Sequence, residues 1–395
     1  MAGISDNKAP PDRRDGLWYR LIVNTMGTAR KVLVAALALH LLLVANAVRH
    51  SSEPQFDFDR YWKIASTPGT PYRDFQVEHP IGTLLLFRTL AATTGSRNGF
   101  TLSVVLINAA ADMTIIAALI WGWGPAAGAA FALAVLPMAA LLLDRIDLWS
   151  MAAATLAVAA WKRDRSILAG ASLALGAAFK LWPLMFGVLF AATWWRRRDA
   201  RSLTSLMSGA AVSSVLLVVW WILAGWHGMY EVLTFRGATG WQIESTVGSV
   251  IHLVTRLPIR LEQDSWRIGT LIGPVTILMF VIAMPVCFWS VWRGGTRGHI
   301  GVGWLAGVSA LLLLSALLSA QFAGWLLPGA AMSWVEGHRR SAALAWIAAA
   351  LTGLFMAMYG SVVDGTLGAV LVVLRNVVLA VLCVSALVAL RETAA

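Results

Sequence analysis

The sequence predicts an all-α, polytopic integral membrane protein with about twelve transmembrane helices. Hydrophobic residues make up 58% of the 395 residues and charged residues 13%, whereas soluble domains carry about 25% charged residues. The apolar residues form continuous runs rather than an alternating pattern, which indicates helices and excludes a transmembrane β-barrel. The runs cover residues 31–48, 99–121, 126–143, 148–161, 166–180, 181–195, 203–224, 267–292, 300–318, 322–335, 341–360 and 367–390.

The chain reads as one transmembrane domain behind a short polar segment. Residues 1–30 are expected to lie in the cytoplasm, and residues 31–390 form a single transmembrane domain. The first apolar run follows a segment that is too charged for a cleavable leader, so we expect it to act as an uncleaved signal anchor. Cys287 and Cys383 lie inside apolar runs, so the sequence predicts neither a disulfide framework nor a CxxC site.

Lysine and arginine residues set the predicted orientation. The formal net charge is +11, and the basic residues gather in short loops, which face the cytoplasm in membrane proteins. Positive-inside topology therefore explains the charge, and nucleic acid is not an expected partner. If each apolar run crosses once, residues 79–92 are re-entrant or interfacial, because Arg88 interrupts them. The basic loops are 162–165, 196–201, 293–299 and 337–340.

Two polar segments then lie on the extracytoplasmic side of the plasma (inner) membrane, residues 49–80 and 225–266. The first segment directly follows the first apolar run and is crowded with charged side chains. A charge at the bilayer centre costs about 2.5–3.5 kcal/mol on insertion scales, so this segment belongs outside the hydrocarbon. An acidic loop backed by a helical bundle indicates chemistry at the membrane surface.

Within the first outer segment, Asp57 is the preferred reacting carboxylate. If residues 57–66 are helical, Asp57 and Tyr61 share one face at the i,i+4 spacing. Asp59 shares another face with Lys63 and can form a solvated pair there. A surface ion pair between Asp57 and Arg60 is the structural alternative.

Glu78 and His79 stand directly before Pro80. Proline is favoured in the first turn of a helix, so the apolar stretch that follows is expected to begin there. Glu78 and His79 would then lie at the mouth of that helix. They are either substrate-binding groups or a helix cap.

Three charged residues stand between or within apolar runs. Arg145 and Asp147 belong to a tetrad at 144–147 that the topology places outside, where arginine is disfavoured unless it has a specific task. Lys180 has apolar neighbours on both sides, and a lysine at such a depth either snorkels to the interface or pairs with an anion. A lipid phosphate is a suitable anion for both cations.

The second outer segment has a composition that suits a sugar. Gln242 and Glu244 offer hydrogen bonds, and Trp241 offers a flat apolar face. Arg236 adds a positive charge, and an ordered loop without a ligand is the alternative. Gln321 stands at the start of a late apolar run, where it is expected either to bond a specific group or to link helices.

The order of these motifs is more specific than any one of them. Asp57 is followed four residues later by Tyr61, and then come G-T-P-Y-R-D-F-Q-V-E-H-P at 69–80, R-I-D at 145–147, K-L-W-P at 180–183, G-W-Q-I-E-S at 240–245 and Q-F-A-G-W-L-L-P at 321–328. The series resembles the GT-C polyprenol-phosphate-sugar glycosyltransferases, and most closely family GT87, the polyprenol-phosphate-mannose-dependent mannosyltransferases of actinobacterial envelopes. The resemblance extends from residue 55 to residue 330. Two motifs depart from it: E-H-P-I at 78–81 stands where members often have E-Y-P-P, and Phe322 stands where tyrosine is usual.

The resemblance implies a multi-spanning enzyme of the GT-C type that acts on the extracytoplasmic face. Its donor would be a polyprenyl-phosphate sugar, with mannose favoured, and its acceptor an envelope lipid or glycan that the sequence does not name. The essential aspartate of the first outer loop maps onto Asp57, with Asp59 as the alternative.

The chemistry of such a transfer fits these residue types. A carboxylate can take the proton of the acceptor hydroxyl as the new bond forms, and direct displacement then inverts the anomeric carbon. Fixed cations neutralise the leaving phosphate; Lys180 and Arg145 are the first candidates and Arg236 is a weaker third. The expected substrate-binding residues are Tyr61, Glu78, His79, Asp147, Trp241, Gln242, Glu244 and Gln321.

No cofactor is expected. Asp57-Phe58-Asp59 has the D-x-D spacing that can bind a divalent cation. One pair of carboxylates supplies few ligands, however, so we predict no metal site. The expected partners are the lipid-linked donor, the acceptor and membrane lipids. A transporter or flippase of lipid-linked glycans and a non-catalytic scaffold for envelope assembly are the alternative functions; the lack of an internal repeat weakens the transporter.

Overall fold

The computed structural model describes residues 13–53, 56–234, 236–255 and 257–392. Residues 1–12 of the predicted cytoplasmic segment lie outside the described residues. The described chain is predominantly helical. Its first helices are α1 (Arg13–Arg49), α2 (Phe56–Ser66), α3 (Ile81–Thr94), α4 (Arg97–Trp123), α5 (Pro125–Ala134), α6 (Ala139–Leu143), α7 (Asp147–Lys162), α8 (Ser166–Phe179) and α9 (Gly187–Arg197), with 3₁₀ turns η1 (Leu136–Met138) and η2 (Trp182–Phe186).

The second half adds more helices and a small sheet. Its helices are α10 (Ala200–Leu233), α11 (Thr246–Val254), α12 (Gly273–Arg297), α13 (Ile300–Leu313), α14 (Leu327–Val335), α15 (Arg339–Ala357), α16 (Tyr359–Val363) and α17 (Leu367–Glu392), with the 3₁₀ turn η3 (Ala320–Leu326). The strands are β1 (Trp241–Gln242), β2 (Ile259–Glu262) and β3 (Ser265–Ile268).

Seven of the described helical segments are long and apolar enough to cross a membrane. The predicted class, a helical membrane protein with several spans, is thereby confirmed; the count of about twelve crossings stays a prediction. The seven segments are Gly27–Arg49, Arg97–Trp123, Pro125–Leu143, Ala200–Leu233, Gly273–Arg297, Arg339–Ala357 and Leu367–Glu392.

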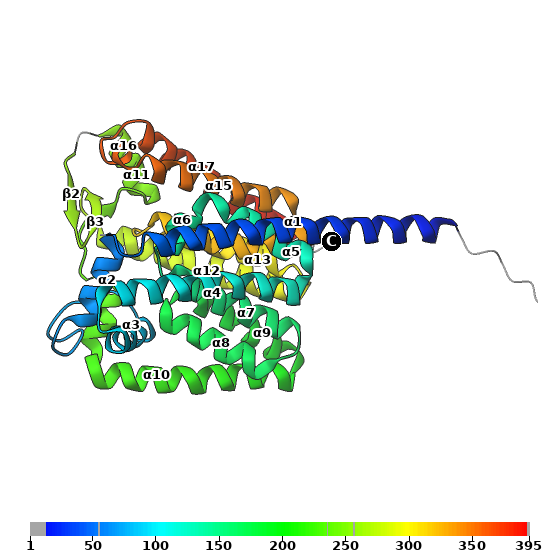
Figure 1. Ribbon diagram of the computed structural model, residues 1–395, viewed down its shortest axis with the longest axis horizontal. Coiled ribbons are helices and arrows are strands. Elements are labelled where there is room, and N and C mark those ends of the chain that lie inside the picture. The colour runs from blue at the N-terminus through cyan, green and yellow to red at the C-terminus, as the bar shows by residue number, and fades with distance from the viewer. Residues whose placement is uncertain (1–12, 54–55, 235, 256, 393–395) are drawn as a thin grey trace, which may run out of the picture.

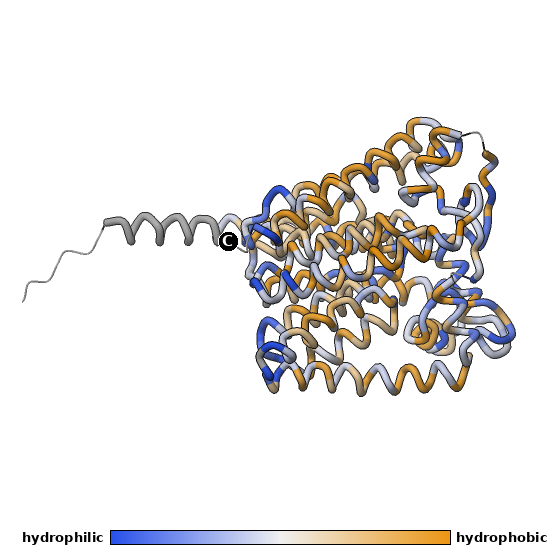
Figure 2. Tube along the Cα trace, turned by 180° about the vertical axis from the view of Figure 1, so that it is seen from behind, coloured by the Kyte–Doolittle hydropathy of each residue, from blue (hydrophilic) through white to orange (hydrophobic). Residues whose placement is uncertain are grey.

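The long helices lie side by side in one bundle with two polar ends. One end carries α2, α3, α11, α16 and the strands, and the C-terminus lies at the other end (Figure 1). Hydrophobic residues cover the length of the bundle and hydrophilic residues gather at its ends (Figure 2), as expected when the middle is in hydrocarbon and the ends are in water. The short run predicted at 79–92 is α3, which lies at the end that carries the strands.

The second outer segment is more ordered than a loop. α10 continues beyond a break at Gly225, whose φ of 59° interrupts the helix, and ends only at Leu233. The strands then pair antiparallel in the order β1-β3-β2. The predicted apolar run 267–292 therefore begins too early. Arg267 belongs to β3, and α12 begins at Gly273, where Pro274 stands in the first helical turn and favours a helix start.

Prolines break two other predicted runs. The run at 126–143 consists of α5, η1 and α6, with Pro137 in the 3₁₀ turn. The run at 181–195 opens with η2, which contains Pro183. Proline has no backbone N–H and cannot continue the hydrogen-bond ladder of an α-helix, which accounts for the 3₁₀ turns at these positions.

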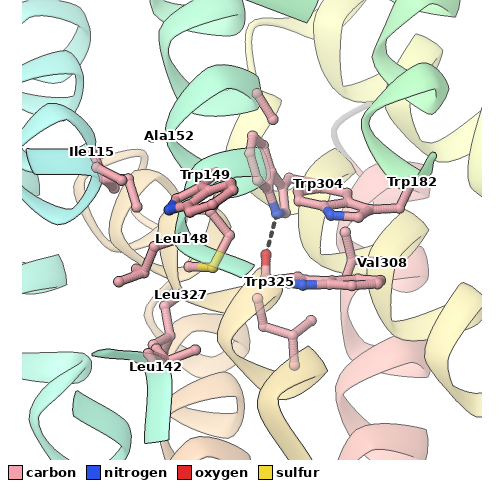
Figure 3. Packing of buried hydrophobic residues seen from close by; sticks show 14 of the residues in the cluster. Ile115, Leu142, Leu148, Trp149, Ala152, Trp182, Trp304, Val308, Trp325 and Leu327 are labelled. Carbon is pink, nitrogen blue, oxygen red and sulfur yellow. Dashed lines mark hydrogen bonds between the residues drawn. The ribbon is translucent and has the colours of Figure 1, made fainter. Parts of the chain in front are cut away.

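A cluster of tryptophans packs the core below the end that carries the strands. Trp182 and Trp325 stack with ring centroids 4.9 Å apart, and Trp182 meets Trp304 edge to face at 5.7 Å. Trp304 is fully buried, and its indole N–H donates to the Trp325 carbonyl at 2.7 Å, the dashed line in Figure 3. A buried indole needs such a partner, and here it ties α13 to η3 beneath the candidate site.

Candidate functional site

The centre of the candidate site is an ion pair between Asp57 and Arg145. Asp57 lies in the first turn of α2, and Arg145 lies in the turn between α6 and α7. Arg145 Nη1 donates to Asp57 Oδ1, with both side chains mostly buried. The alternative pairing of Asp57 with Arg60 is not present, because the Arg60 guanidinium binds Glu78 instead.

The protonation of Asp57 reflects two opposing effects. Burial raises the pKa of its carboxyl above the usual value, and the positive charges of Arg145 and Arg60 partly offset that rise. The net direction is upward. A carboxylate with a raised pKa is a stronger base toward a hydroxyl proton, so this environment suits the role that the sequence predicts.

Lys180 and Asp147 form a second buried pair. Lys180 Nζ lies 2.7 Å from Asp147 Oδ1, and the Trp325 indole N–H donates to the same oxygen at 2.8 Å. The Lys180 ammonium also stands over the Phe322 ring, 4.6 Å from its centroid. Lys180 ends α8 in an extended conformation, which turns it toward α7 and η3. The sequence placed this lysine near an anion, and the anion in the structure is Asp147.

Arg145 connects the two pairs electrostatically. Burial lowers the pKa of its guanidinium, but the negative charges of Asp57, Asp147 and Glu244 and the Tyr61 hydroxyl outweigh that effect, so the net direction is upward. These groups come from α2, α7 and the turn after β1. Residues far apart in the sequence therefore meet around one arginine.

A second cluster of charges surrounds Glu78. Its carboxylate contacts the Arg60 guanidinium, His79 Nε2 at 3.0 Å and Arg236 Nε at 3.6 Å. Burial alone would raise the pKa of Glu78, but His79, Arg60 and Arg236 lower it strongly. Pro80 is the residue before α3, and no side chain caps that helix, so Glu78 binds cations rather than capping. Arg236 also binds Asp264 at 3.1 Å.

Tyr61 and His79 pack together between these two clusters. Their ring centroids are 5.7 Å apart, edge to face, and Tyr61 is buried with 3% of its surface exposed. Burial and the nearby Asp57 charge raise the pKa of the Tyr61 phenol, so it stays protonated. A protonated phenol beside Asp57 can donate a hydrogen bond to a substrate oxygen.

The second outer segment contributes Gln242 and Glu244 to a buried network. Gln242 Nε2 donates to Glu244 Oε2 at 2.7 Å and to Ser319 Oγ at 2.8 Å. Arg375 Nη2 donates to the Glu244 carbonyl at 2.8 Å, and Tyr359 hydrogen-bonds its carboxylate. Burial raises the pKa of the Glu244 carboxyl despite these partners. Thus the C-terminal helices support the residue that faces Arg145.

Three predicted site residues have other placements. Asp59 pairs with Arg97 at 2.7 Å, on a partly exposed side of α2, which leaves Asp57 as the buried carboxylate. Trp241 is only 3% exposed, and its indole N–H donates to the Thr270 carbonyl; its contact with a sugar stays a prediction. Gln321 is half-buried in η3.

Three residues of this site were not predicted from the sequence. Arg375 and Asn376 form a polar pair within the apolar run of α17, and both bind the Glu244 carbonyl. A buried charge in an apolar run was the signal that could have revealed them. Asp144 was visible in the tetrad. Its carboxyl is half-buried beside Arg145, and burial and the Asp57 charge raise its pKa to about 6.

Metal coordination has little to build on here. The described residues contain no group of three or more histidine, cysteine, aspartate or glutamate side chains that could hold a metal ion. The prediction of a site without a metal stays a prediction.

Neither a scan against protein-family models nor a search of curated proteins found a match to this chain.

Proposed function

We propose that this protein is a GT-C type glycosyltransferase, of the kind found in family GT87, that moves a sugar from a polyprenyl phosphate to an envelope lipid or glycan. Mannose is the proposed sugar because of the sequence resemblance. The observation that carries the proposal is the meeting of Asp57 and Asp147 around Arg145 at one polar end of the bundle, with Lys180 paired to Asp147. A base next to fixed cations is what this reaction needs.

In the proposed reaction, Asp57 accepts the proton of an acceptor hydroxyl while the hydroxyl oxygen attacks the anomeric carbon. The bond between that carbon and the phosphate oxygen breaks, and its electron pair leaves with the polyprenyl phosphate. The new glycosidic bond has the inverted configuration. Arg145 and Lys180 would bind the phosphate, whose charge grows as it leaves.

Each proposed phosphate-binding cation has a carboxylate partner, and this pairing supports the mechanism. Arg145 is held by Asp57 and Lys180 by Asp147. A buried cation without a counter-charge is costly, so these carboxylates stabilise the cations before a donor binds. Tyr61 and Glu244 lie near Arg145 and are the proposed contacts to donor or acceptor hydroxyls.

We further propose twelve crossings, with the site on the extracytoplasmic side of the plasma membrane. Contacts support the count, because successive helix ends alternate between the two ends of the bundle. Trp123, Lys162 and Glu336 meet at one end, whereas Arg145, Lys180 and Glu244 belong to the other. The end with Trp123 carries the basic loops, which favours the cytoplasm.

Reconstituted protein distinguishes transfer from transport. Proteoliposomes of the full chain are given radiolabelled polyprenyl-phosphate mannose and an envelope lipid extract, and products are resolved by mass. Glycosyl transfer predicts a labelled product whose mass exceeds that of an extracted lipid or glycan by one hexose. Translocation of the donor without any such product would overturn the proposal in favour of a flippase.

A further inference from the structure

The basic end of the bundle contains a cavity that glycosyl transfer does not use. It has a volume of about 250 Å³, several times the ~30 Å³ share of one water molecule. Its walls come from the ends of α7, α9 and α12, so three separate helices must pack as they do to form it. The lining residues are Trp161, Thr193, Arg196, Gly295 and Thr296.

Arg196 is the cation of this cavity. Within the described part of the chain its guanidinium has neither an ion pair nor a hydrogen bond, whereas three neighbouring arginines each have a partner. Arg198 lies over the Trp194 and Trp195 rings, Arg201 pairs with Asp164 at 2.7 Å, and Arg163 donates to the Trp121 carbonyl. None of the described residues that line the cavity is acidic. A guanidinium in that position is open to an anion.

The other lining groups suit a phosphate at the membrane surface. The Thr193 and Thr296 hydroxyls bond carbonyls of their own helices, at Leu189 and Arg293, and can rotate to donate to a ligand. Trp161 stands in the last turn of α7, and tryptophans near the ends of membrane helices are typical of the headgroup region. Basic pockets between transmembrane helices bind lipid headgroups, and guanidinium, hydroxyl and indole groups are all hydrogen-bond donors.

Two other effects favour an arginine at position 196 without any ligand. The C-terminal ends of α7, α9 and α12 each carry about half a negative charge, which attracts an arginine without any ligand. Positive-inside topology also places arginines here. Neither explanation produces a cavity, however, and the arginines at these ends, including Arg293 and Arg297, outweigh the helix dipoles in charge.

We propose that this cavity binds a phosphate group, with Arg196 as its principal ligand. The group belongs either to an anionic lipid of the leaflet at the basic end or to a soluble phosphate ester. The site lies at the opposite end of the bundle from Asp57 and does not depend on the proposed glycosyl transfer.

Native mass spectrometry of the full chain in neutral detergent tests the site. Phosphatidylglycerol is titrated into the wild type, Arg196→Ala and Arg196→Lys. Arg340→Ala is the matched control, because Arg340 is an exposed arginine in the first turn of α15 and does not line the cavity. We expect Arg196→Ala to bind its first phosphatidylglycerol about tenfold more weakly, the effect of one lost charge-assisted hydrogen bond. Arg196→Lys and Arg340→Ala should resemble the wild type more closely.

A second titration with glycerol 3-phosphate identifies the source of the phosphate. Binding of glycerol 3-phosphate that depends on Arg196 and displaces the lipid indicates a soluble ester. Binding of phosphatidylglycerol that glycerol 3-phosphate does not displace indicates a lipid headgroup. Equal binding by the wild type and Arg196→Ala overturns the proposal, as does an equal loss in Arg340→Ala, which would show that only the overall charge of this end matters.

Discussion

Arg145 Nη1 donates a hydrogen bond to Asp57 Oδ1 and so joins the turn before α7 to the first helix of the outer segment, 88 residues apart. The pair has two consequences. It gives a buried carboxylate its ion-pair partner, and it leaves a cation next to the atom that would accept a proton. The proposed chemistry follows from both.

Replacing Arg145 tests that relationship. In Arg145→Gln the carboxyl of Asp57 loses the positive charge that lowers its pKa, so the acid limb of the kcat/KM profile for sugar transfer should move to higher pH. The leaving phosphate also loses a cation, and kcat should fall about 10²–10³-fold. Arg97→Gln is the control, because Arg97 pairs with Asp59. An unchanged pH profile in Arg145→Gln would contradict the assignment.

Variants of the Lys180–Asp147 pair distinguish a catalytic role of Lys180 from a purely structural one. Lys180→Met leaves the Asp147 carboxylate buried, with Trp325 as its remaining donor, and should cost about 3–5 kcal/mol in the free energy of unfolding as well as activity. The double variant Lys180→Met/Asp147→Leu removes both charges and should recover most of the stability, measured by thermal unfolding. Its transfer activity should remain low. Recovery of activity together with stability would show that Lys180 serves only the fold.

Asp144 predicts a pH dependence of stability. Its pKa in the folded protein is about 6, raised from the usual 3.8, so the folded state binds more protons than the unfolded state between these values. Stability from this group is therefore present at low pH and falls as pH rises from about 4 to about 6. Thermal unfolding of Asp144→Asn, compared with the wild type across this window, should lack that slope. Parallel pH profiles for the two proteins would contradict the prediction.

His40 and Asp112 hold α1 to the bundle. His40 Nδ1 lies 2.5 Å from Asp112 Oδ2, and His40 Nε2 lies 2.8 Å from the Ala132 carbonyl, with both side chains buried. Asp112→Leu leaves the imidazole without its acid and should cost about 3 kcal/mol. His40→Leu/Asp112→Leu should cost much less, since both polar groups are gone. Equal losses in the single and double variants would indicate that packing volume, not pairing, matters.

The sequence predicted the helical membrane class well because long apolar runs have few alternative structures in a bilayer. The predicted boundaries of the apolar runs were less accurate where tertiary contacts, rather than local sequence, determine where a helix begins. Arg267 lies in β3, which pairs with β1 and β2, and no local sequence pattern predicted these strands. The breaks at Pro137 and Pro183, by contrast, were visible as prolines within apolar runs.

The candidate site was predicted in part. Lys180 and Arg145 could be selected from the sequence because each lies beside apolar runs, where a charged side chain is energetically unfavourable. Their partners could not, because a linear sequence does not tell which carboxylate faces which cation. The environment of Trp241 could not be predicted from the sequence. An aromatic residue near glycines suits a sugar, but the burial of Trp241 beside Thr270 depends on pairing in the sheet.

The most direct measurement compares Asp57→Asn with Asp59→Asn in the transfer assay from polyprenyl-phosphate mannose. The two aspartates are two residues apart in α2, yet Asp57 binds Arg145 and Asp59 binds Arg97. We expect Asp57→Asn to lose activity by about 10²–10⁴-fold, the usual contribution of a general base, and Asp59→Asn to stay near the wild type. Full activity in Asp57→Asn, with the protein folded in the membrane, would contradict the central claim.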